Sequence, residues 1–308
     1  DADALVHNYH PTRMSDFGLE YEALANHNPH LVMTSISPFG QTGPRREYTA
    51  HDLTMWSAGG LGFLGGAGGR PDLPPLKAFG QQAGFQAGVN AGLASLGALY
   101  GRLSSGKGQH IDISVQECLV AIMENNFIAW PYDRSTPSRL GFRLIPQDVL
   151  QCRDGYIYVL AVEEHQWQNA VELMGSPEWA DTELFQDFVS RSVNWDALKA
   201  LLEDWLQDKS VQEVYHGAQK RRVPFAPVST MGDLLKSEHL NARGFFAEIA
   251  HPEGGLLRYP GAPYNFSASP WALRSPAPCL GQHNEEIYGG QLGLSPEELK
   301  SLKETNVI

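Results

Sequence analysis

Two adjacent residues, His51 and Asp52, are candidates for proton-transfer chemistry in this chain. An imidazole titrates near pH 6.5, which suits His51 to exchange a proton with a bound substrate at neutral pH. A structural interpretation competes with this one: Asp52 caps the helix that follows it, and His51 packs in a loop. We favour the structural interpretation for both residues.

A pair of arginines is a candidate for binding phosphate. Arg45 and Arg46 follow the Gly43-Pro44 turn, and a guanidinium can bind a phosphate through two parallel hydrogen bonds. The alternative is a solvated turn that carries two arginines. The glycines from Gly59 to Gly69 lack the spacing of a dinucleotide-binding motif, and they predict a flexible lid or a crossing loop instead.

The composition limits the classes of protein to which this chain can belong. Its 308 residues are 42% hydrophobic and 19% charged, which is typical of a globular protein with a sizeable core. A net charge of −12 argues against a nucleic-acid partner, and no apolar run is long enough to cross a membrane. Cys118, Cys152 and Cys279 lack the spacing of zinc ligands, so we expect no metal site and a reducing, cytoplasmic location.

Alternating strands and helices predict an α/β fold around these candidates. Residues 4–9 and 31–36 have the branched, apolar character of buried strands, and a loop rich in Gly and Pro follows at 38–44. Open α/β sheets bind ligands at the carboxyl ends of their strands, so this loop is expected at the binding edge. The other elements expected in this half are helices at 21–26, 51–57, 86–103 and 115–130, and a strand at 111–114.

The pattern changes at about residue 143, which predicts three regions. They are a large lobe (1–142), a small α+β domain (143–230) and a C-terminal segment that packs back on the large lobe (231–308). The first residues resemble the middle of a strand-forming region, so we expect an upstream segment. The later elements expected are a strand at 155–162, helices at 164–174, 195–206, 210–220, 231–236, 239–243 and 295–305, and an extended linker at 224–228.

Short motifs in a fixed order carry a family resemblance along nearly the whole chain. They are Asn8-Tyr9-His10-Pro11, Asn28-Pro29-His30-Leu31-Val32, Gly40-Gln41-Thr42-Gly43-Pro44, His51-Asp52, Ser105-Gly106-Lys107-Gly108-Gln109, Val223-Pro224-Phe225-Ala226-Pro227-Val228, Ala242-Arg243-Gly244-Phe245-Phe246 and Gly281-Gln282-His283-Asn284. The series resembles the family III CoA-transferases (the CaiB/BaiF family). That resemblance implies a Rossmann-like large lobe with an open, mostly parallel sheet, a smaller α+β lobe and interlocked dimers. It also implies transfer of coenzyme A (CoA) between carboxylic acids, with relatives that racemise 2-methylacyl-CoA.

The resemblance places a glycine where the family has its nucleophile. Family members carry a carboxylate shortly before an Ala/Gly-rich helix, and counting back from Gly106 by the family's usual spacing reaches Gly84. That carboxylate attacks the acyl-CoA thioester to give an anhydride and a thiolate. The thiolate then returns to form an enzyme–CoA thioester, which the acceptor acid resolves. Neither Gly84 nor the uncharged amide of Gln82 can perform this attack.

The sequence around Gly84 offers no replacement acid. No Asp or Glu occurs between Asp72 and Asp112, so shifting the alignment by a few residues does not recover one. The alternative is a carboxylate that arrives from elsewhere, such as Asp72, Glu47 or Asp52, or from a partner chain.

The same resemblance implies where CoA binds. Asn8, Tyr9 and Arg13 lie at positions that resemble the adenosine-facing loop of the family, and with the two arginines named above they are the expected CoA-binding residues. In the racemase branch, a histidine at the position of His51 exchanges the α-proton of the acyl-CoA, paired with the acid that is absent here.

Three functions therefore stay open. The first is a CoA-transferase-family enzyme that acts on acyl-CoA thioesters and carboxylic acids through an atypical active site. The second is a non-catalytic CoA-transferase-like subunit that pairs with an acid-bearing partner. The third is racemase-like proton transfer through His51. The resemblance further implies either a homodimer or a heterodimer with a related subunit.

Overall fold

The structure is a computed structural model, and it describes residues 2–65, 73–136 and 147–308. Contacts between Cα atoms divide the chain into two compact units, Asp1–Gln147 with Leu160–Lys199, and Asp148–Val159 with Ala200–Ile308. Asp72, residues 66–69 of the glycine stretch, and the predicted boundary after residue 142 lie outside the described residues. Within the described part of that stretch, Leu61–Leu64 forms a short helix where a flexible lid or a crossing loop was expected.

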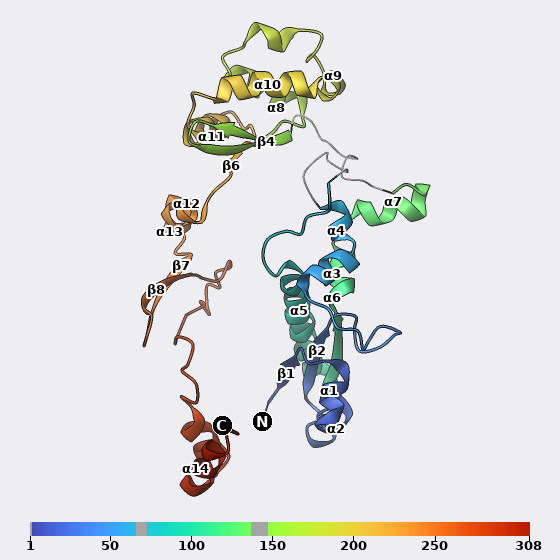
Figure 1. The fold of residues 1–308 in the computed structure, drawn as a ribbon, viewed down its shortest axis with the longest axis vertical. Helices are drawn as coiled ribbons and strands as arrows, with labels where there is room; N and C mark the ends of the chain where they lie inside the picture. Colours follow the sequence, from blue (N-terminus) through green and yellow to red (C-terminus); the bar gives the residue numbers. More distant parts are fainter. Residues whose placement is uncertain (1, 66–72, 137–146) are drawn as a thin grey trace. The chain divides into compact units, whose positions relative to one another are not determined.

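A three-stranded parallel sheet forms the centre of the first unit. Its strands are β1 (Ala4–His7), β2 (Val32–Ser37) and β3 (Gln109–Ser114), with β2 in the middle. The register places Val6 beside Thr34 and Thr34 beside Ile111. The expected α/β fold with an open, parallel sheet is therefore confirmed, and the carboxyl ends of all three strands meet at one edge (Figure 1).

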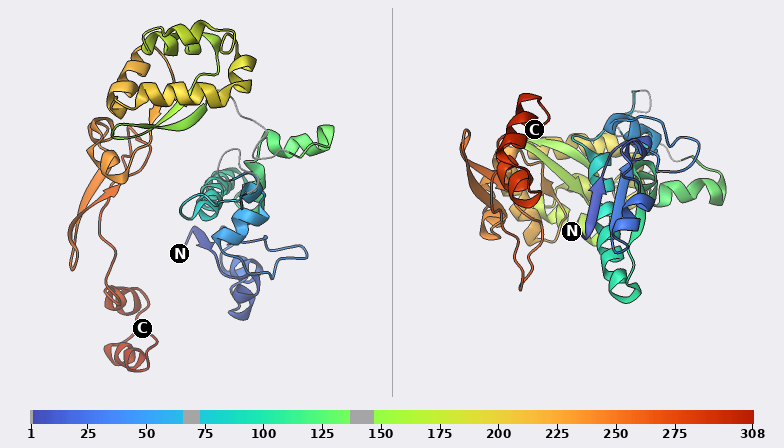
Figure 2. Two further views of the ribbon diagram at one scale, coloured as in Figure 1. Left: turned by 45° about the horizontal axis from the view of Figure 1, so that its top comes forward. Right: turned by 90° about the horizontal axis from the view of Figure 1, so that it is seen from below.

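A long helix of small residues covers one face of this sheet. The helix, α5 (Gln82–Ser105), packs against β2 and β3 (Figures 1 and 2). Its buried positions recur about every four residues, so a single face of the helix meets the strands. Only small side chains occupy that face, which lets the two backbones approach closely. The buried residues of α5 are Ala83, Ala87, Ala91, Ser95 and Ala98.

Shorter helices complete the first unit. One expected helix, at 115–130, is instead two helices separated at Ile122–Glu124. At this break Glu124 has a positive φ of 49°, and the Asn126 side chain donates to the Met123 carbonyl at 3.2 Å, which offers the backbone an alternative to helical bonding. The helices of the unit are α1 (Pro11–Asp16), α2 (Tyr21–His27), α3 (Asp52–Ala58), α4 (Leu61–Leu64), α6 (Val115–Ala121), α7 (Asn125–Asp133), α8 (Glu164–Leu173), the 3-10 helix η1 (Glu178–Asp181), α9 (Phe188–Val193) and the start of α10 (Trp195–Leu206).

The second unit contains a three-stranded sheet, a hairpin and helices. The stretch expected as an extended linker at 224–228 contributes a strand, because Ala226–Pro227 pairs antiparallel with Ile157 and Tyr158. The final helix begins at Pro296 after a capping Ser295, close to the predicted boundary. The elements are β4 (Gln147–Cys152), β5 (Gly155–Leu160), β6 (Ala226–Pro227), β7 (Phe246–His251), β8 (Gly255–Pro260), α11 (Val211–Lys220), α12 (Met231–Lys236), α13 (Glu238–Ala242), the π-helix η2 (Glu285–Gln291) and α14 (Pro296–Glu304).

A fully buried arginine ties α8 to α9, and its replacement yields a stability prediction. Arg191 donates to Glu164 at 2.7 Å and to the Phe185 carbonyl at 2.9 Å, and its guanidinium lies 4.9 Å from the centre of the Trp167 ring. We expect Arg191→Met to lower the free energy of unfolding by about 1–2 kcal/mol, since Glu164 is half-exposed and can be solvated while the carbonyl loses its donor. Chemical denaturation measures this difference. The exposed Lys220→Ala should change stability by less than about 0.5 kcal/mol, and an equal loss in both variants would contradict the prediction.

None of the described helices is both long enough and apolar enough to cross a membrane.

Candidate active site

The start of α5 is capped by a residue thirty positions earlier in the chain. The Asp52 carboxylate accepts hydrogen bonds from the backbone N–H groups of Ala83, at 2.9 Å, and Gly84, at 3.2 Å. The local N-cap residue, Gln81, makes no side-chain capping bond. Asp52 therefore supplies the cap of α5 from the first turn of α3. The expectation that Asp52 caps the helix that follows it is wrong, because its carboxylate binds a different helix.

A lysine holds the second oxygen of this carboxylate. Lys77 Nζ lies 2.8 Å from Asp52 Oδ2, and both side chains are largely buried, with exposed fractions of 19% and 8%. Lys77 also donates to the carbonyls of Ala78 and Gly80, so it fixes the segment that leads into α5. Burial opposes the charge on Asp52, but the hydrogen bonds from Lys77, Gly84 and Ala83 outweigh it and hold the pKa of Asp52 below its ordinary value.

An apolar cluster joins the helices α3, α5 and α6 next to this ion pair. Met55 of α3, Ala83 of α5 and Leu119 of α6 pack together in the core. Phe39, from the loop that follows β2, packs against the same cluster. The loop at the carboxyl end of the sheet is therefore anchored next to the start of α5, where the sequence placed the reactive group.

Gly84 lies within the first turn of α5, exposed on the outside of the helix. This corrects the expected helix start, which was Gln86; the helix begins at Gln82, because the cap comes from Asp52. A Cβ at Gly84 would have Gln81 Cβ as its nearest neighbour, at 3.9 Å. A larger side chain therefore fits at this position. The side chain of Gln82 turns back and donates to the Phe79 carbonyl at 2.8 Å.

His51 immediately precedes α3 and does not share the partners of Asp52. Its backbone is extended and its side chain is exposed, and it caps α3 without a side-chain hydrogen bond. The structure therefore gives the imidazole solvent access, while Asp52 points into the protein to meet Lys77 and the start of α5. The two neighbours in sequence have separate environments.

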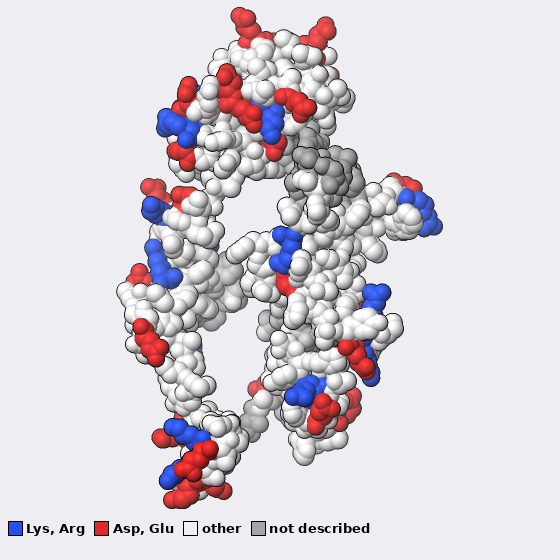
Figure 3. Space-filling model, viewed as in Figure 1, with Lys and Arg blue, Asp and Glu red and all other residues white. Residues whose placement is uncertain are grey.

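The expected CoA-binding residues lie in two segments that contact each other, one running from β1 into α1 and the other following β2. Asn8, Tyr9 and Arg13 follow β1, while Arg45 and Arg46 follow the loop after β2, and all five are exposed. The ring of His10 bonds the Glu47 carbonyl at 3.0 Å, which joins the two loops. On the face drawn in Figure 3, Lys and Arg lie in small groups among Asp, Glu and uncharged residues.

A carboxylate at the end of β3 holds the second of these loops. Asp112 accepts the backbone N–H of Gln41 with both oxygens, at 3.0 and 2.9 Å. Gly40 has a φ of 86°, and a Cβ there would lie 3.4 Å from the same carboxylate, so a glycine is needed at this turn. Sequence reasoning missed Asp112 and Lys77. The one available sequence signal was an acid within the strand predicted at 111–114.

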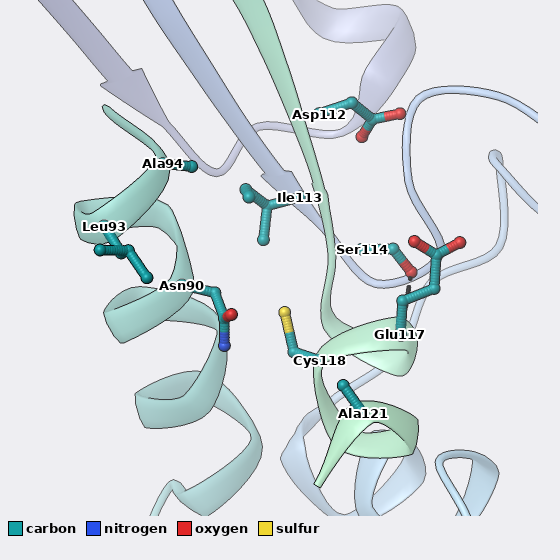
Figure 4. Close-up of a pocket in the computed structure, with 9 residues that line it drawn as sticks. All are labelled: Asn90, Leu93, Ala94, Asp112, Ile113, Ser114, Glu117, Cys118 and Ala121. Atoms are coloured by element: carbon teal, nitrogen blue, oxygen red, sulfur yellow. Dashed lines mark hydrogen bonds between the residues drawn. The ribbon is translucent and has the colours of Figure 1, made fainter. Parts of the chain in front are cut away.

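A cavity of about 350 Å³ lies between α5, β3 and α6 (Figure 4). Asn90 and Leu93 face it from α5, and Cys118 faces it from α6. Burial and the neighbouring Glu117 carboxylate raise the pKa of the Cys118 thiol. The thiol therefore stays protonated at neutral pH, and a protonated thiol is a weak nucleophile. Cys118 is itself buried.

Comparison with known proteins identifies the family. The family model of CoA-transferase family III matches residues 1–284. This chain belongs to CoA-transferase family III. It is 32% identical over 297 residues to succinyl-CoA:(R)-benzylsuccinate CoA-transferase subunit BbsE of Thauera aromatica, covering 93% of this chain and 72% of that protein. It is 28% identical over 312 residues to the succinyl-CoA–L-malate CoA-transferase alpha subunit of Chloroflexus aurantiacus, covering 100% of this chain and 72% of that protein.

The crystal structure of a CaiB/BaiF family protein from Brucella suis has the same fold. It superposes with a TM-score of 0.83 at 30% identity, over 94% of this chain and 75% of that protein. The family resemblance inferred from the ordered motifs is therefore confirmed.

Proposed function

We propose that this chain is a CoA-transferase subunit that binds acyl-CoA but lacks its own nucleophile. A related, acid-bearing subunit would supply the attacking carboxylate, and the pair would transfer CoA between carboxylic acids. The observation that carries the proposal is the first turn of α5, where Gly84 occupies the expected position of the nucleophile and the nearest carboxylate, Asp52, is bound on both oxygens.

The contacts of Asp52 argue against its use as a substitute nucleophile. An attacking carboxylate needs an oxygen that can reach a thioester carbon, whereas Asp52 is 8% exposed. One oxygen accepts two backbone N–H groups, and the other faces the Lys77 ammonium. These bonds stabilise the negative charge and would be lost during attack, so they lower the nucleophilicity of the group.

Glu47, the second acid considered, also lies in a different setting. It forms an exposed ion pair with Arg46 at 3.1 Å, on the loop expected to bind CoA. A carboxylate on that loop would repel the CoA phosphates unless Arg46 neutralised it, so its pairing suits a supporting role in the binding surface.

Loop geometry supports CoA binding by this chain. The loops after β1 and β2 meet at the carboxyl edge of a parallel sheet, which is where open α/β folds bind their ligands. Arg45 and Arg46 on the second loop, and Arg13 in α1, are exposed and can bind phosphate. Asn8 and Tyr9 then lie at the position expected for the adenosine.

The names of the two relatives support pairing with a second chain. Both are subunits of CoA-transferases, one acting with succinyl-CoA and benzylsuccinate and the other with succinyl-CoA and malate. A subunit that is always paired can lose one copy of the nucleophile while it keeps its binding loops. We infer that a carboxylic acid and an acyl-CoA are the substrates here too.

An exchange assay tests this proposal. Isolated chain is mixed with succinyl-CoA and labelled succinate, and the label that enters CoA ester is measured with and without a second CoA-transferase family III subunit that carries the acid. We expect exchange only in the mixture, together with CoA binding by the isolated chain. Exchange at the same rate per site by the isolated chain would contradict the proposal.

A further inference from the structure

Three polar side chains form a hydrogen-bonded chain across one face of the parallel sheet. Ser35 Oγ of β2 lies 2.6 Å from His7 Nε2 of β1 and 2.8 Å from His110 Nε2 of β3. His7 and Ser35 are adjacent in register, and His110 lies two residues before Asp112, the neighbour of Ser35, so all three share a face. The opposite face packs against α5.

The backbone of the loop after β1 extends this hydrogen-bond network and determines where its protons lie. Tyr9 N–H donates to His7 Nδ1 at 3.3 Å, so Nδ1 is unprotonated and the proton lies on Nε2. His7 Nε2–H then donates to Ser35, and the Ser35 hydroxyl donates to His110 Nε2. Both imidazoles are neutral in this arrangement.

The burial of His7 and Ser35 shows that the His7–Ser35–His110 hydrogen-bond network does not contact a substrate directly. Ser35 is 1% exposed and His7 is 8% exposed, so the hydroxyl cannot reach a thioester. The two imidazoles face each other across Ser35, and a tyrosine stacks on each: Tyr9 on His7 at 6.0 Å, and Tyr21 of α2 on His110 at 5.5 Å. His7 is linked to the exposed loop after β1 by the hydrogen bond that it accepts from the Tyr9 backbone N–H.

We propose that His7, Ser35 and His110 are positioning residues that hold the Asn8–Tyr9 segment in the conformation that binds CoA, and that acid releases it. The inference rests on the proposed CoA-binding role of that loop. Protonating His7 places a hydrogen on Nδ1, opposite the Tyr9 N–H, and two donors cannot bond each other. The segment then loses the contact that ties it to β1.

The direction of the pH effect follows from the environment of His7. Burial, and then the neighbouring His110, lower the pKa of His7 below its ordinary value. The neutral form and its bond to Tyr9 are therefore fully present above about pH 6.5, the value of a free histidine. They are lost as the pH falls through the lowered pKa of the folded protein.

A matched pair of substitutions at His7 tests the proposal. An Asn side chain places its oxygen where Nδ1 lies and keeps the acceptor for Tyr9 N–H, whereas a Gln side chain reaches toward Ser35 and loses it. We expect CoA affinity at pH 8, measured by calorimetry, to fall about tenfold in His7→Gln and less than threefold in His7→Asn. The CoA affinity of wild type should also decrease between pH 7 and 5.5 as His7 becomes protonated. His7→Asn should lack this contribution, because Asn does not titrate. CoA titrates in this range itself, so the comparison at equal pH cancels that contribution.

A buried serine on the opposite face of the sheet is the control for general destabilisation. Ser95 Oγ bonds Thr34 at 2.7 Å and lies 8% exposed, without a link to the loop. Ser95→Ala should leave CoA affinity within twofold of wild type, while Ser35→Ala should weaken it about fivefold. Equal affinities for these two variants, or for His7→Gln and His7→Asn, would overturn the proposal.

A ligand-free measurement separates this inference from the proposed function. Nitrogen-15 spectra of the imidazoles should show His7 with its proton on Nε2, and the Tyr9 amide shift should follow the titration of His7. Failure of wild type to bind CoA would contradict the proposed function. These spectra would still test whether His7 holds the Asn8–Tyr9 segment. A proton on Nδ1 of His7 at pH 8 would overturn it.

Discussion

Gly84→Asp should create CoA-transfer activity in the isolated chain. Gly84 is the third residue of α5 and is exposed, and a Cβ there meets nothing closer than 3.9 Å. A carboxylate in the first turn is favoured by the helix dipole, and Asp is a better helix residue than Gly. We expect exchange of label between succinyl-CoA and succinate to rise about 100-fold or more above background, because a covalent pathway becomes available. The rate of exchange and a hydroxylamine-sensitive enzyme thioester are the two readouts.

Two substitutions control for effects other than nucleophilicity. Gly84→Asn has nearly the same shape without the charge. Gly88→Asp places a carboxylate one turn further along the same exposed side, where a Cβ also meets open space. Neither should form the thioester. If both matched Gly84→Asp, or if Gly84→Asp stayed at background while CoA bound normally, the assignment of this position would be wrong.

Asp52→Ala should destabilise the fold strongly, because Asp52 has a structural role and not a catalytic one. It removes the cap of α5 and leaves Lys77 in a largely buried position without its carboxylate. We expect the free energy of unfolding at pH 7 to fall by about 3–5 kcal/mol, measured by chemical denaturation. Asp196→Ala, at an exposed acid in the first turn of α10, should change it by less than about 0.5 kcal/mol.

The pH dependence of this effect has a defined sign. The pKa of Asp52 is lower in the folded protein than in the unfolded chain, so its stabilisation is complete above the unfolded pKa, about 3.9. The stabilisation is lost as the pH falls through the lower folded value. The difference between wild type and Asp52→Ala should therefore shrink below about pH 4. A difference that stays constant down to pH 2 would show that the charge of Asp52 does not contribute.

The central sheet and the family could be predicted from the sequence because their signals are local. The branched, apolar runs at β1 and β2 and the Gly/Pro loop between Pro38 and Pro44 occur over a few residues each. The small residues of α5 likewise predicted a closely packed helix. The order of such motifs also gave the family, since each motif keeps its place relative to the others.

Contacts between distant residues could not be predicted in this way. The cap of α5 comes from Asp52, so no local capping residue marks the start of the helix, which was predicted at Gln86 and lies at Gln82. The role of Lys77 was hidden for the same reason, because its partner lies 25 residues away in sequence. The His7–Ser35–His110 chain depends on strand register, which alternation within a single strand does not define.

The most direct test of the account is to locate the enzyme–CoA thioester in a mixture of this chain with its acid-bearing partner. The mixture is given succinyl-CoA, trapped, digested and analysed by mass spectrometry. We predict that the adduct lies on a carboxylate of the partner, and that peptides containing Asp52 or Glu47 of this chain are unmodified. An adduct on a carboxylate of this chain would contradict it.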